Sequence, residues 1–363
     1  MWICPKIRLQ KLAAGNTFWR AQTGRFHGMI NVLDFAPLGR VFLGGGSAAT
    51  AHRATMKVLG LCSGRKNGNT EIMMKEIFKT IEADCGAECR LVRIQEAEIR
   101  NCTGCETCMI NHLKGNLDFR CIHKSDSDHF YFIEQLMREA DAIIVSSPAY
   151  NLMPVGALIR FLNKLHASGD YRDLVQRRQG KIGAAFSLGG TDWTNFTLDM
   201  CNMIAMELAG SYENVVDLAH FDFVPSVGAV VLEPQIMDRM VQMGHTVAKA
   251  LQAREKGEKI AYEGNRGLCP DCHGIKIEKR DDGWYCPQCL TKATLSMENG
   301  ELKVDFTPEE MAKNRWSPWG QELHNNNIMK GHKKAGMGKE TIDQKRKEYG
   351  ELDYAVQLPV IEK

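Results

Sequence analysis

Between residues 57 and 256, short apolar runs alternate with longer segments in which apolar residues recur every three or four positions. The first pattern is typical of buried strands and the second of amphipathic helices. The predicted strands are 57–62, 89–94, 142–146, 182–187 and about 214–218. The predicted helices are about 70–83, 126–140, 155–167, 195–209 and 234–256. This alternation predicts an α/β fold with a doubly wound, five-stranded parallel sheet, which binds ligands at the carboxyl ends of its strands.

The chain changes character on either side of this segment. Residues 1–55 lack clear periodicity and hold seven Lys or Arg against one acidic residue. We expect a dispensable or mis-assigned leader there, with a flexible extension and an acid-poor targeting peptide as the alternatives. A charged stretch at 257–266 marks a domain boundary. The predicted parts are therefore a main domain at 56–256, a small module at 267–306 and a polar tail at 307–363 with a helical stretch near 339–348.

Composition excludes several classes of protein. The 363 residues are 44% hydrophobic and 25% charged with a net charge of +2, which lacks the basic excess typical of nucleic-acid-binding proteins. No apolar run of about 18 residues occurs, so we predict no membrane span. Eight of the thirteen cysteines fall in two groups with C-x-x-C spacing, which favours thiolate ligands in a reducing compartment. We expect a soluble cytoplasmic protein.

The first predicted strand ends in a polar turn that leads directly into a helix. This turn reads Ser-Gly-Arg-Lys-Asn-Gly-Asn-Thr over residues 63–70. A helix N-terminus offers unpaired backbone N–H groups and a partial positive charge, and both favour phosphate. We expect Ser63, Asn69 and Thr70 to add hydroxyl or amide donors; the alternative is a simple helix cap at Thr70.

Two more loops follow strands at the same predicted sheet edge. Residues 146–154 read Ser-Ser-Pro-Ala-Tyr-Asn-Leu-Met-Pro, in which Tyr150 offers an aromatic face and Asn151 an amide to a planar ring. Residues 188–193 read Leu-Gly-Gly-Thr-Asp-Trp. This second loop weakens the alternative that Tyr150 merely packs on the next helix. Trp193 either stacks on the ring or packs at the start of its helix.

With these loops, the segment from about 56 to 256 resembles the NADPH-dependent FMN reductase branch of the flavodoxin-like superfamily. The family's phosphate loop is matched by Ser63, Arg65, Gly68, Asn69 and Thr70. Its flavin loop is matched by Ser147, Pro148, Tyr150, Met153 and Pro154. The resemblance implies that the first loop holds the FMN phosphate and that the second, with Gly189 and Gly190, borders the isoalloxazine. The predicted FMN-binding residues are Ser63, Arg65, Gly68, Asn69, Thr70, Ser147, Pro148, Ala149, Tyr150, Asn151, Met153, Gly189, Gly190, Thr191 and Trp193.

Four cysteines after the second strand have the spacing of metal ligands. Cys102, Cys105 and Cys108 recur at every third position, and Cys121 follows after twelve residues. A tight loop can wrap three close thiolates round one cluster, whereas structural zinc usually takes two ligands from each of two knuckles. The run resembles the iron–sulfur flavoproteins, a subset of the same family, which implies a [4Fe–4S] cluster on these four residues. The last gap is longer than in that subset, and we expect 111–120 to loop out; reduced thiols or a redox-active pair are the alternatives.

Four further cysteines form two knuckles near the C-terminus. They are separated by thirteen residues, and they are Cys269, Cys272, Cys286 and Cys289. Asn299-Gly300 between two apolar runs predicts a β-hairpin beside them. Together these features predict a zinc ribbon whose Zn²⁺ is structural and redox-silent. A rubredoxin-like iron site and contact with nucleic acid are the alternatives.

The sequence thus predicts a flavin-dependent oxidoreductase that couples FMN to a [4Fe–4S] cluster. The alternatives are an NAD(P)H-dependent flavin or quinone reductase without a cluster, and a non-catalytic flavin-binding regulator that docks a partner through its ribbon. NAD(P)H or a redox protein is the expected electron donor, and the resemblance implies a homodimer or homotetramer. No residue is predicted to act as an acid or a base, although His166 and His220 are the nearest candidates.

Overall fold

The computed structural model describes residues 55–123, 128–169, 180–265, 267–352, 354–356 and 359. The predictions for residues 1–54 lie outside these residues, as does the start of the helix predicted at 126–140. Within the described part of the chain, no helix is both long and apolar enough to cross a membrane.

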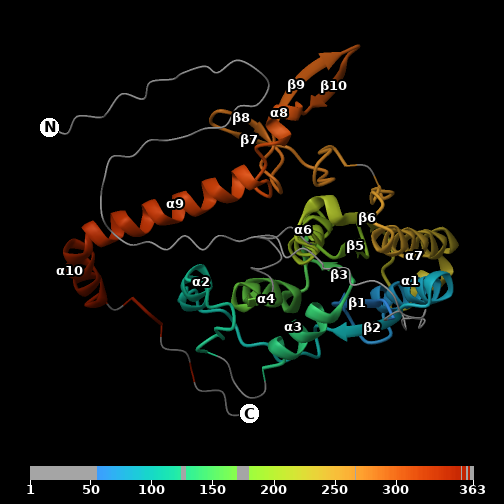
Figure 1. Cartoon of the computed structure of the whole chain (residues 1–363), viewed down its shortest axis with the longest axis horizontal. Coiled ribbons are helices and arrows are strands. Elements are labelled where there is room, and N and C mark those ends of the chain that lie inside the picture. Colours follow the sequence, from blue (N-terminus) through green and yellow to red (C-terminus); the bar gives the residue numbers. More distant parts are fainter. Residues whose placement is uncertain are drawn as a thin grey trace, which may run out of the picture. The chain divides into compact units, whose positions relative to one another are not determined.

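Five parallel strands form the central sheet (Figure 1). They lie in the order β2-β1-β3-β5-β6, which is the flavodoxin-like order. Their bounds are Lys57–Cys62 for β1, Glu88–Arg93 for β2, Ala142–Tyr150 for β3, Ile182–Leu188 for β5 and Val215–Phe221 for β6. The predicted fold class is confirmed. The sequence does not predict β4 (Met153–Pro154), a short strand that pairs antiparallel with the end of β3.

Helices cover both faces of this sheet (Figure 1). One face carries α1 (Asn69–Cys85) and α7 (Pro234–Glu255), and the other carries α3 (Phe130–Glu139), α4 (Gly156–Lys164) and α6 (Thr197–Ala209). Successive residues of a strand point to opposite faces. In β1, Val58 accordingly packs in the core beneath α1 and α7, whereas Leu59 packs in the core beneath α3, α4 and α6.

The predicted ribbon is a separate antiparallel sheet. Its strands lie in the order β10-β9-β8-β7, and they are β7 (Glu278–Arg280), β8 (Gly283–Tyr285), β9 (Lys292–Glu298) and β10 (Glu301–Asp305). The hairpin predicted at Asn299-Gly300 is confirmed, since it joins β9 to β10. The connection to the main domain is not a loose linker, because the N–H groups of Glu263 and Asn265 donate to carbonyls of β6 at 2.9 and 3.1 Å.

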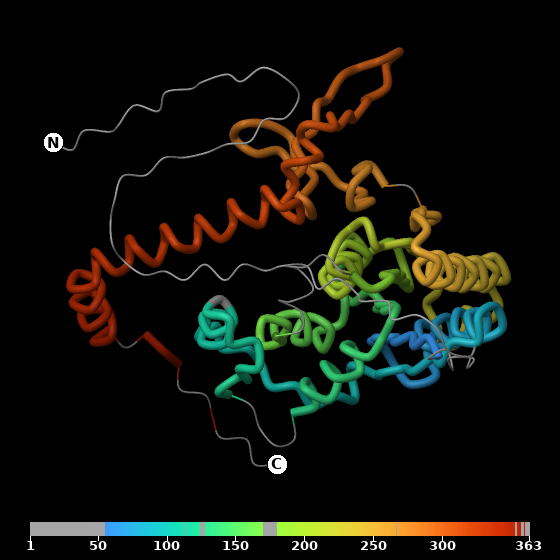
Figure 2. Tube along the Cα trace, viewed as in Figure 1, coloured from blue at the N-terminus to red at the C-terminus, as the bar shows by residue number. Residues whose placement is uncertain are grey.

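The described residues that follow the ribbon form three helices, and Figure 2 shows the two longer ones. The three helices are α8 (Pro308–Met311), α9 (Pro318–Met337) and α10 (Lys339–Gly350), and only α10 matches a predicted helical stretch. The hydroxyl of Ser317 caps α9 by accepting the N–H of Gly320 at 3.1 Å. Gly320 is the one buried residue of this helix. Because α9 has no apolar stripe, its periodicity could not reveal it.

Candidate functional site

A cavity of about 380 Å³ opens at the carboxyl edge of the parallel sheet. Four segments line it, namely the loops after β1, β5 and β6 and the end of β3 with the turn that follows it. This edge includes the switch point of a doubly wound sheet, where neighbouring connections leave in opposite directions and a crevice forms. The predicted site residues in its lining are Arg65, Gly68, Asn69, Thr70, Pro148, Ala149, Tyr150, Asn151, Gly190, Thr191 and Trp193.

Two predicted site residues, Ser63 and Ser147, lie behind this lining. Both are buried, and their hydroxyls donate to the carbonyl oxygens of Ser146 and Pro148 at 2.8 and 2.9 Å. These serines therefore brace the ends of β1 and β3 and do not face the cavity.

The fourth lining loop is not predicted from the sequence. This loop follows β6 and supplies Val224, Pro225, Ser226 and Val227, and Leu188 at the end of β5 was also missed. The loop has no Gly-rich motif, so its residues gave no local signal. Only the order of the strands could have indicated this loop, because the carboxyl end of every parallel strand lies at the same sheet edge.

The loop after β1 places the N-terminus of α1 at the cavity. Gly64 adopts a φ of +143°, and a Cβ there would lie 2.5 Å from Thr70 Oγ1, so a larger residue would strain the loop. The first N–H groups of α1 have no partner within the helix. Arg65 also lines the cavity, and a cationic residue beside such N–H groups favours an anion.

The side chains of Asn69 and Thr70 have partners inside the protein. Asn69 Nδ2 donates to the carbonyl of Ser226 at 2.8 Å, and its Oδ1 accepts the N–H of Val230 at 3.2 Å. Thr70 Oγ1 donates to the carbonyl of Ser63 at 3.3 Å. Both side chains line the cavity and also have partners within the protein, and Asn69 ties the first lining loop to the fourth.

Glu71 anchors the loop after β1. Its carboxylate accepts two hydrogen bonds from the Arg93 guanidinium at 2.8 and 2.9 Å and one from the N–H of Asn67 at 3.2 Å. Lys75 Nζ lies 2.6 Å from the same carboxylate. Arg93 above all lowers the pKa of Glu71 to about 2. The Asn67 backbone has a φ of +56°, so this contact holds the loop in a conformation that is uncommon for a residue with a side chain.

We expect Glu71→Gln to lower the free energy of unfolding at pH 7 by about 1–3 kcal/mol, because Arg93 loses a charged partner. The folded-state pKa is lowered, so the stabilisation is present above the unfolded pKa near 4.5 and is lost as the pH falls towards 2. Urea unfolding at several pH values measures this. Glu71→Gln should flatten the loss of stability below pH 4.5, whereas the control Glu76→Gln, which removes a surface pair with Lys79, should change little. An unchanged acid profile in Glu71→Gln would contradict the anchoring role.

A tight turn forms the wall after β3. Tyr150 pairs with Met153, and the two residues between them, Asn151 and Leu152, have φ values of +51° and +72°. This positive-φ pair is typical of a type I′ hairpin turn, and it is unfavourable for leucine. The predicted site residue Met153 thus belongs to the hairpin that presents Tyr150 and Asn151, and it is not a lining residue.

A side-chain network fixes the loop after β5. His220 Nδ1 lies 2.6 Å from Ser187 Oγ, and Nε2 lies 2.9 Å from Thr194 Oγ1 and 3.1 Å from Asp222 Oδ1. Gly189, a predicted site residue, lies under Thr194, where a Cβ would approach its methyl carbon to 2.1 Å. His220 therefore braces this wall of the cavity and is not one of its lining residues.

The first cysteine group lies on the loop after β2. Cys102 and Cys105 are exposed, whereas Cys108 and Cys121 are half-buried against the core. A short helix, α2 (Thr107–Leu113), begins within the group, so the expectation that 111–120 would simply loop out is wrong in part. Among the described residues, three or more ligand sulfurs come within 4.8 Å of one another only in the C-terminal group. A four-iron cluster needs wider spacing than a single ion, because each sulfur binds a different iron.

The segment that leads to this group runs along α4. Arg160 donates to the carbonyl of Ala97 at 3.4 Å, and Lys164 Nζ donates to the carbonyl of Arg100 at 3.2 Å. Lys164 is buried and also lies 3.2 Å from Asp128 Oδ2. The cysteine loop therefore lies towards the C-terminal end of α4, whose N-terminus follows the cavity wall.

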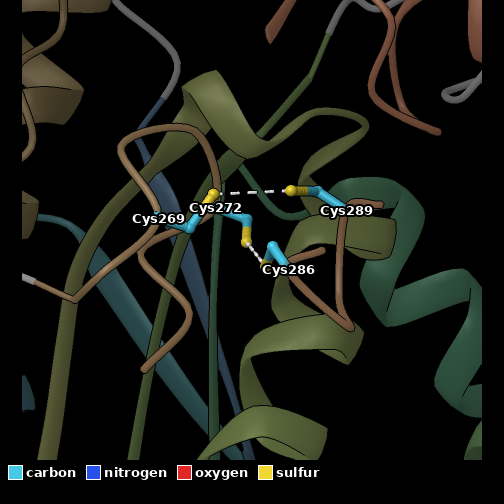
Figure 3. Close-up of side chains that lie close together, drawn as sticks. All are labelled: Cys269, Cys272, Cys286 and Cys289. Atoms are coloured by element: carbon cyan, nitrogen blue, oxygen red, sulfur yellow. Dashed lines mark hydrogen bonds between the residues drawn. The ribbon is translucent and has the colours of Figure 1, made fainter. Parts of the chain in front are cut away.

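The second cysteine group forms a closed, buried site. Figure 3 shows the four sulfurs turned towards one another, and all lie within 4.8 Å. Cys269 Sγ is 3.5 Å from Cys289 Sγ, and Cys272 Sγ is 3.4 Å from Cys286 Sγ. Tetrahedral zinc with Zn–S bonds of about 2.3 Å separates its sulfurs by about 3.8 Å. The four thiols therefore fit a single metal ion.

Polar residues surround this second group. Thr291 Oγ1 lies 3.0 Å from Cys289 Sγ and donates to the buried carboxylate of Asp271 at 3.0 Å. The N–H of Arg315 donates to the carbonyl of Cys289 at 2.7 Å. Such contacts orient metal ligands.

Comparison with known proteins assigns the main domain. Residues 56–210 match the sequence profile of the family described as NADPH-dependent FMN reductase. This segment is a domain of the NADPH-dependent FMN reductase family. It ends just after α6 and includes the first three lining loops and the first cysteine group. The predicted family is confirmed.

Curated relatives of this FMN reductase domain include iron–sulfur flavoproteins. One from Archaeoglobus fulgidus is 28% identical over 211 residues, which are 56% of this chain and 84% of that protein. Another from Methanocaldococcus jannaschii is 31% identical over 137 residues, which are 38% of this chain and 63% of that protein. A solved structure titled flavone reductase has a TM-score of 0.67 at 22% identity and covers 84% of this chain and all of its own, and this likeness shows the fold.

The match of residues 56–210 to the FMN reductase family supports the predicted flavin-dependent oxidoreductase and supports FMN as the cofactor. The C-terminal sheet with its four buried cysteines fits the predicted ribbon module.

Proposed function

We propose that the chain binds FMN in the cavity at the carboxyl edge of the sheet. The FMN phosphate would lie at the N-terminus of α1 beside Arg65, and the isoalloxazine would lie between the loops after β3, β5 and β6. The observation that carries this proposal is the convergence of four loops and one helix N-terminus on a single cavity. The family match supports FMN as the occupant.

Bound FMN supplies the ability to accept two electrons together and release them singly. Among the described lining residues there is no Asp, Glu or His. The side chains of the cavity would therefore bind and orient the flavin and exclude water, and the loops after β3 and β5 would hold their geometry through the Asn151-Leu152 turn and the His220 network.

We further propose that Cys102, Cys105, Cys108 and Cys121 hold a [4Fe–4S] cluster that exchanges single electrons with FMN. The names of the curated relatives support this, as does a loop with Gly104 at a φ of +69° that can turn round a cluster. Cys121 is held by its N–H, which donates to Tyr131 Oη at 2.5 Å. Its neighbour Arg120 lies over the same ring at 4.2 Å.

The C-terminal site would hold Zn²⁺ as a structural ion, because four buried thiolates without an open position leave no place for a substrate. NAD(P)H or a redox protein would deliver the electrons, and the chain would form a homodimer or homotetramer. A contact between subunits at the cavity face is supported by three exposed aromatic residues there, Tyr150, Trp193 and Phe223.

The phosphate assignment predicts the effect of Arg65→Ala. A lost charge-assisted hydrogen bond of about 1.5–3 kcal/mol raises the Kd for FMN about 10- to 100-fold. Titration of the flavin-free chain with FMN, followed by flavin fluorescence, measures this. The control Lys66→Ala removes a neighbouring exposed charge that does not line the cavity and should change the Kd by less than about threefold. Equal effects of both variants would contradict the assignment.

A further inference from the structure

One side chain of α6 forms hydrogen bonds with both cysteine knuckles of the ribbon. Asn202 is 1% exposed, and its Nδ2 donates to the carbonyl of Cys272 and to Gln288 Oε1, both at 2.8 Å. Cys272 belongs to the first knuckle and Gln288 to the second. A single amide therefore contacts both halves of the metal site, and the cysteines share one buried cluster with residues of α6.

One turn nearer the start of α6, Asp199 makes a second connection. Its carboxylate accepts from Gln288 Nε2 at 2.6 Å and forms an ion pair with Lys276 Nζ. The same Lys276 Nζ lies 5.6 Å from the ring centre of Phe196, the residue just before the helix. The knuckles thus contact α6 along its N-terminal half.

The start of α6 is in turn bonded to the wall of the cavity. The N–H of Phe196 donates to the carbonyl of Leu152 at 2.9 Å, in the positive-φ turn that presents Tyr150 and Asn151. Leucine is held there in a conformation that it adopts only when neighbouring contacts enforce it. The chain that enters α6 also supplies Thr191 and Trp193 to the lining.

From this continuous set of contacts we infer that Asn202 and Asp199 are positioning residues through which the metal-loaded ribbon holds the FMN cavity in its binding geometry. This inference rests on the proposed FMN site. The ribbon is then part of the flavin site, although none of its residues lines the cavity. A loss of docking would let α6 shift at its N-terminus and release the strained turn at Leu152.

Three variants test the inference with the full chain. Lys276→Met removes one ion pair at the surface of the contact, Asp199→Ala also removes the bond to Gln288, and Asn202→Ala removes the buried bridge. We expect the Kd for FMN to rise about five- to twentyfold, in the range of typical coupling between sites. Zinc content should be unchanged in Lys276→Met and Asp199→Ala. These two variants therefore test the inference by themselves even if Asn202→Ala fails to fold. Hydrogen exchange should become faster at 150–153 and 191–197.

The matched control is Lys303→Met, which removes another ribbon lysine whose ion pair with Glu298 lies within the β9–β10 hairpin. This variant should bind FMN as the wild type does. Coupling between two binding sites is reciprocal, so FMN should strengthen zinc binding by the same factor by which zinc strengthens FMN binding. Competition of the chain with EDTA for zinc, with and without saturating FMN, measures this factor. If Lys276→Met and Asp199→Ala both keep the wild-type Kd, the inference is overturned. If the wild-type chain binds no FMN, the proposed FMN site fails first, and the inference fails with it.

Discussion

Cys286→Ser is expected to unfold the ribbon and to leave the parallel sheet folded. The four sulfurs lie within 4.8 Å of one another, and the cysteines are four of the five buried apolar residues of the ribbon. Structural zinc contributes about 10–16 kcal/mol of apparent binding free energy in small modules.

Hydrogen exchange and tryptophan fluorescence measure this outcome. In Cys286→Ser, amide protection should vanish across 269–298 and remain in β1, β3 and β5, and zinc should fall to a small fraction of one ion per chain. The control Cys85→Ser replaces a half-buried thiol on α1, and serine can keep its hydrogen bond to the Ile81 carbonyl. Full protection of the ribbon in Cys286→Ser would show that the metal does not hold it together.

Cys105→Ser and Cys121→Ser should each abolish the iron–sulfur cluster while FMN stays bound. The cysteine loop and the cavity lie towards opposite ends of α4, a helix of about 14 Å by its nine residues. A lost cluster ligand therefore should not disturb the flavin loops. Iron should fall from about four to less than about one per chain, and the flavin-to-protein ratio should not change.

The control for these variants is Cys89→Ser, a half-buried thiol of β2 whose pKa burial raises to about 12 and which belongs to neither cysteine group. It should keep its iron. Retention of iron in Cys121→Ser alone would place the fourth ligand elsewhere, and retention in both variants would remove the cluster from this loop.

The sequence was most informative where burial is continuous. The predicted bounds of β1 are confirmed, because every residue from Val58 to Cys62 is buried and the run is wholly apolar or glycine. The bounds of β2 are harder to predict because its residues alternate in exposure, and the strand begins one residue earlier than predicted. The helix α9 has no apolar face to give it a period, and α2 is too short to show one.

Roles that depend on side-chain partners could not be predicted. The motif places Asn69 and Ser63 at the phosphate loop, but their partners, Ser226 and Ser146, lie far away along the chain. The contact of Asn202 with both ribbon knuckles is equally non-local, with a separation of 70 residues from Cys272. The hydrophobic pattern of the sequence indicates which residues follow a strand, whereas tertiary packing determines the orientation of each side chain.

The central proposal is a flavin that exchanges electrons with an iron–sulfur cluster, and anaerobic purification followed by cofactor analysis tests it most directly. We predict one FMN, about four irons and one zinc per chain. Reduction by NAD(P)H or dithionite should bleach the flavin absorbance together with the broad cluster absorbance near it. A chain that holds FMN and zinc but no iron, even when it is kept free of oxygen throughout, would contradict the account.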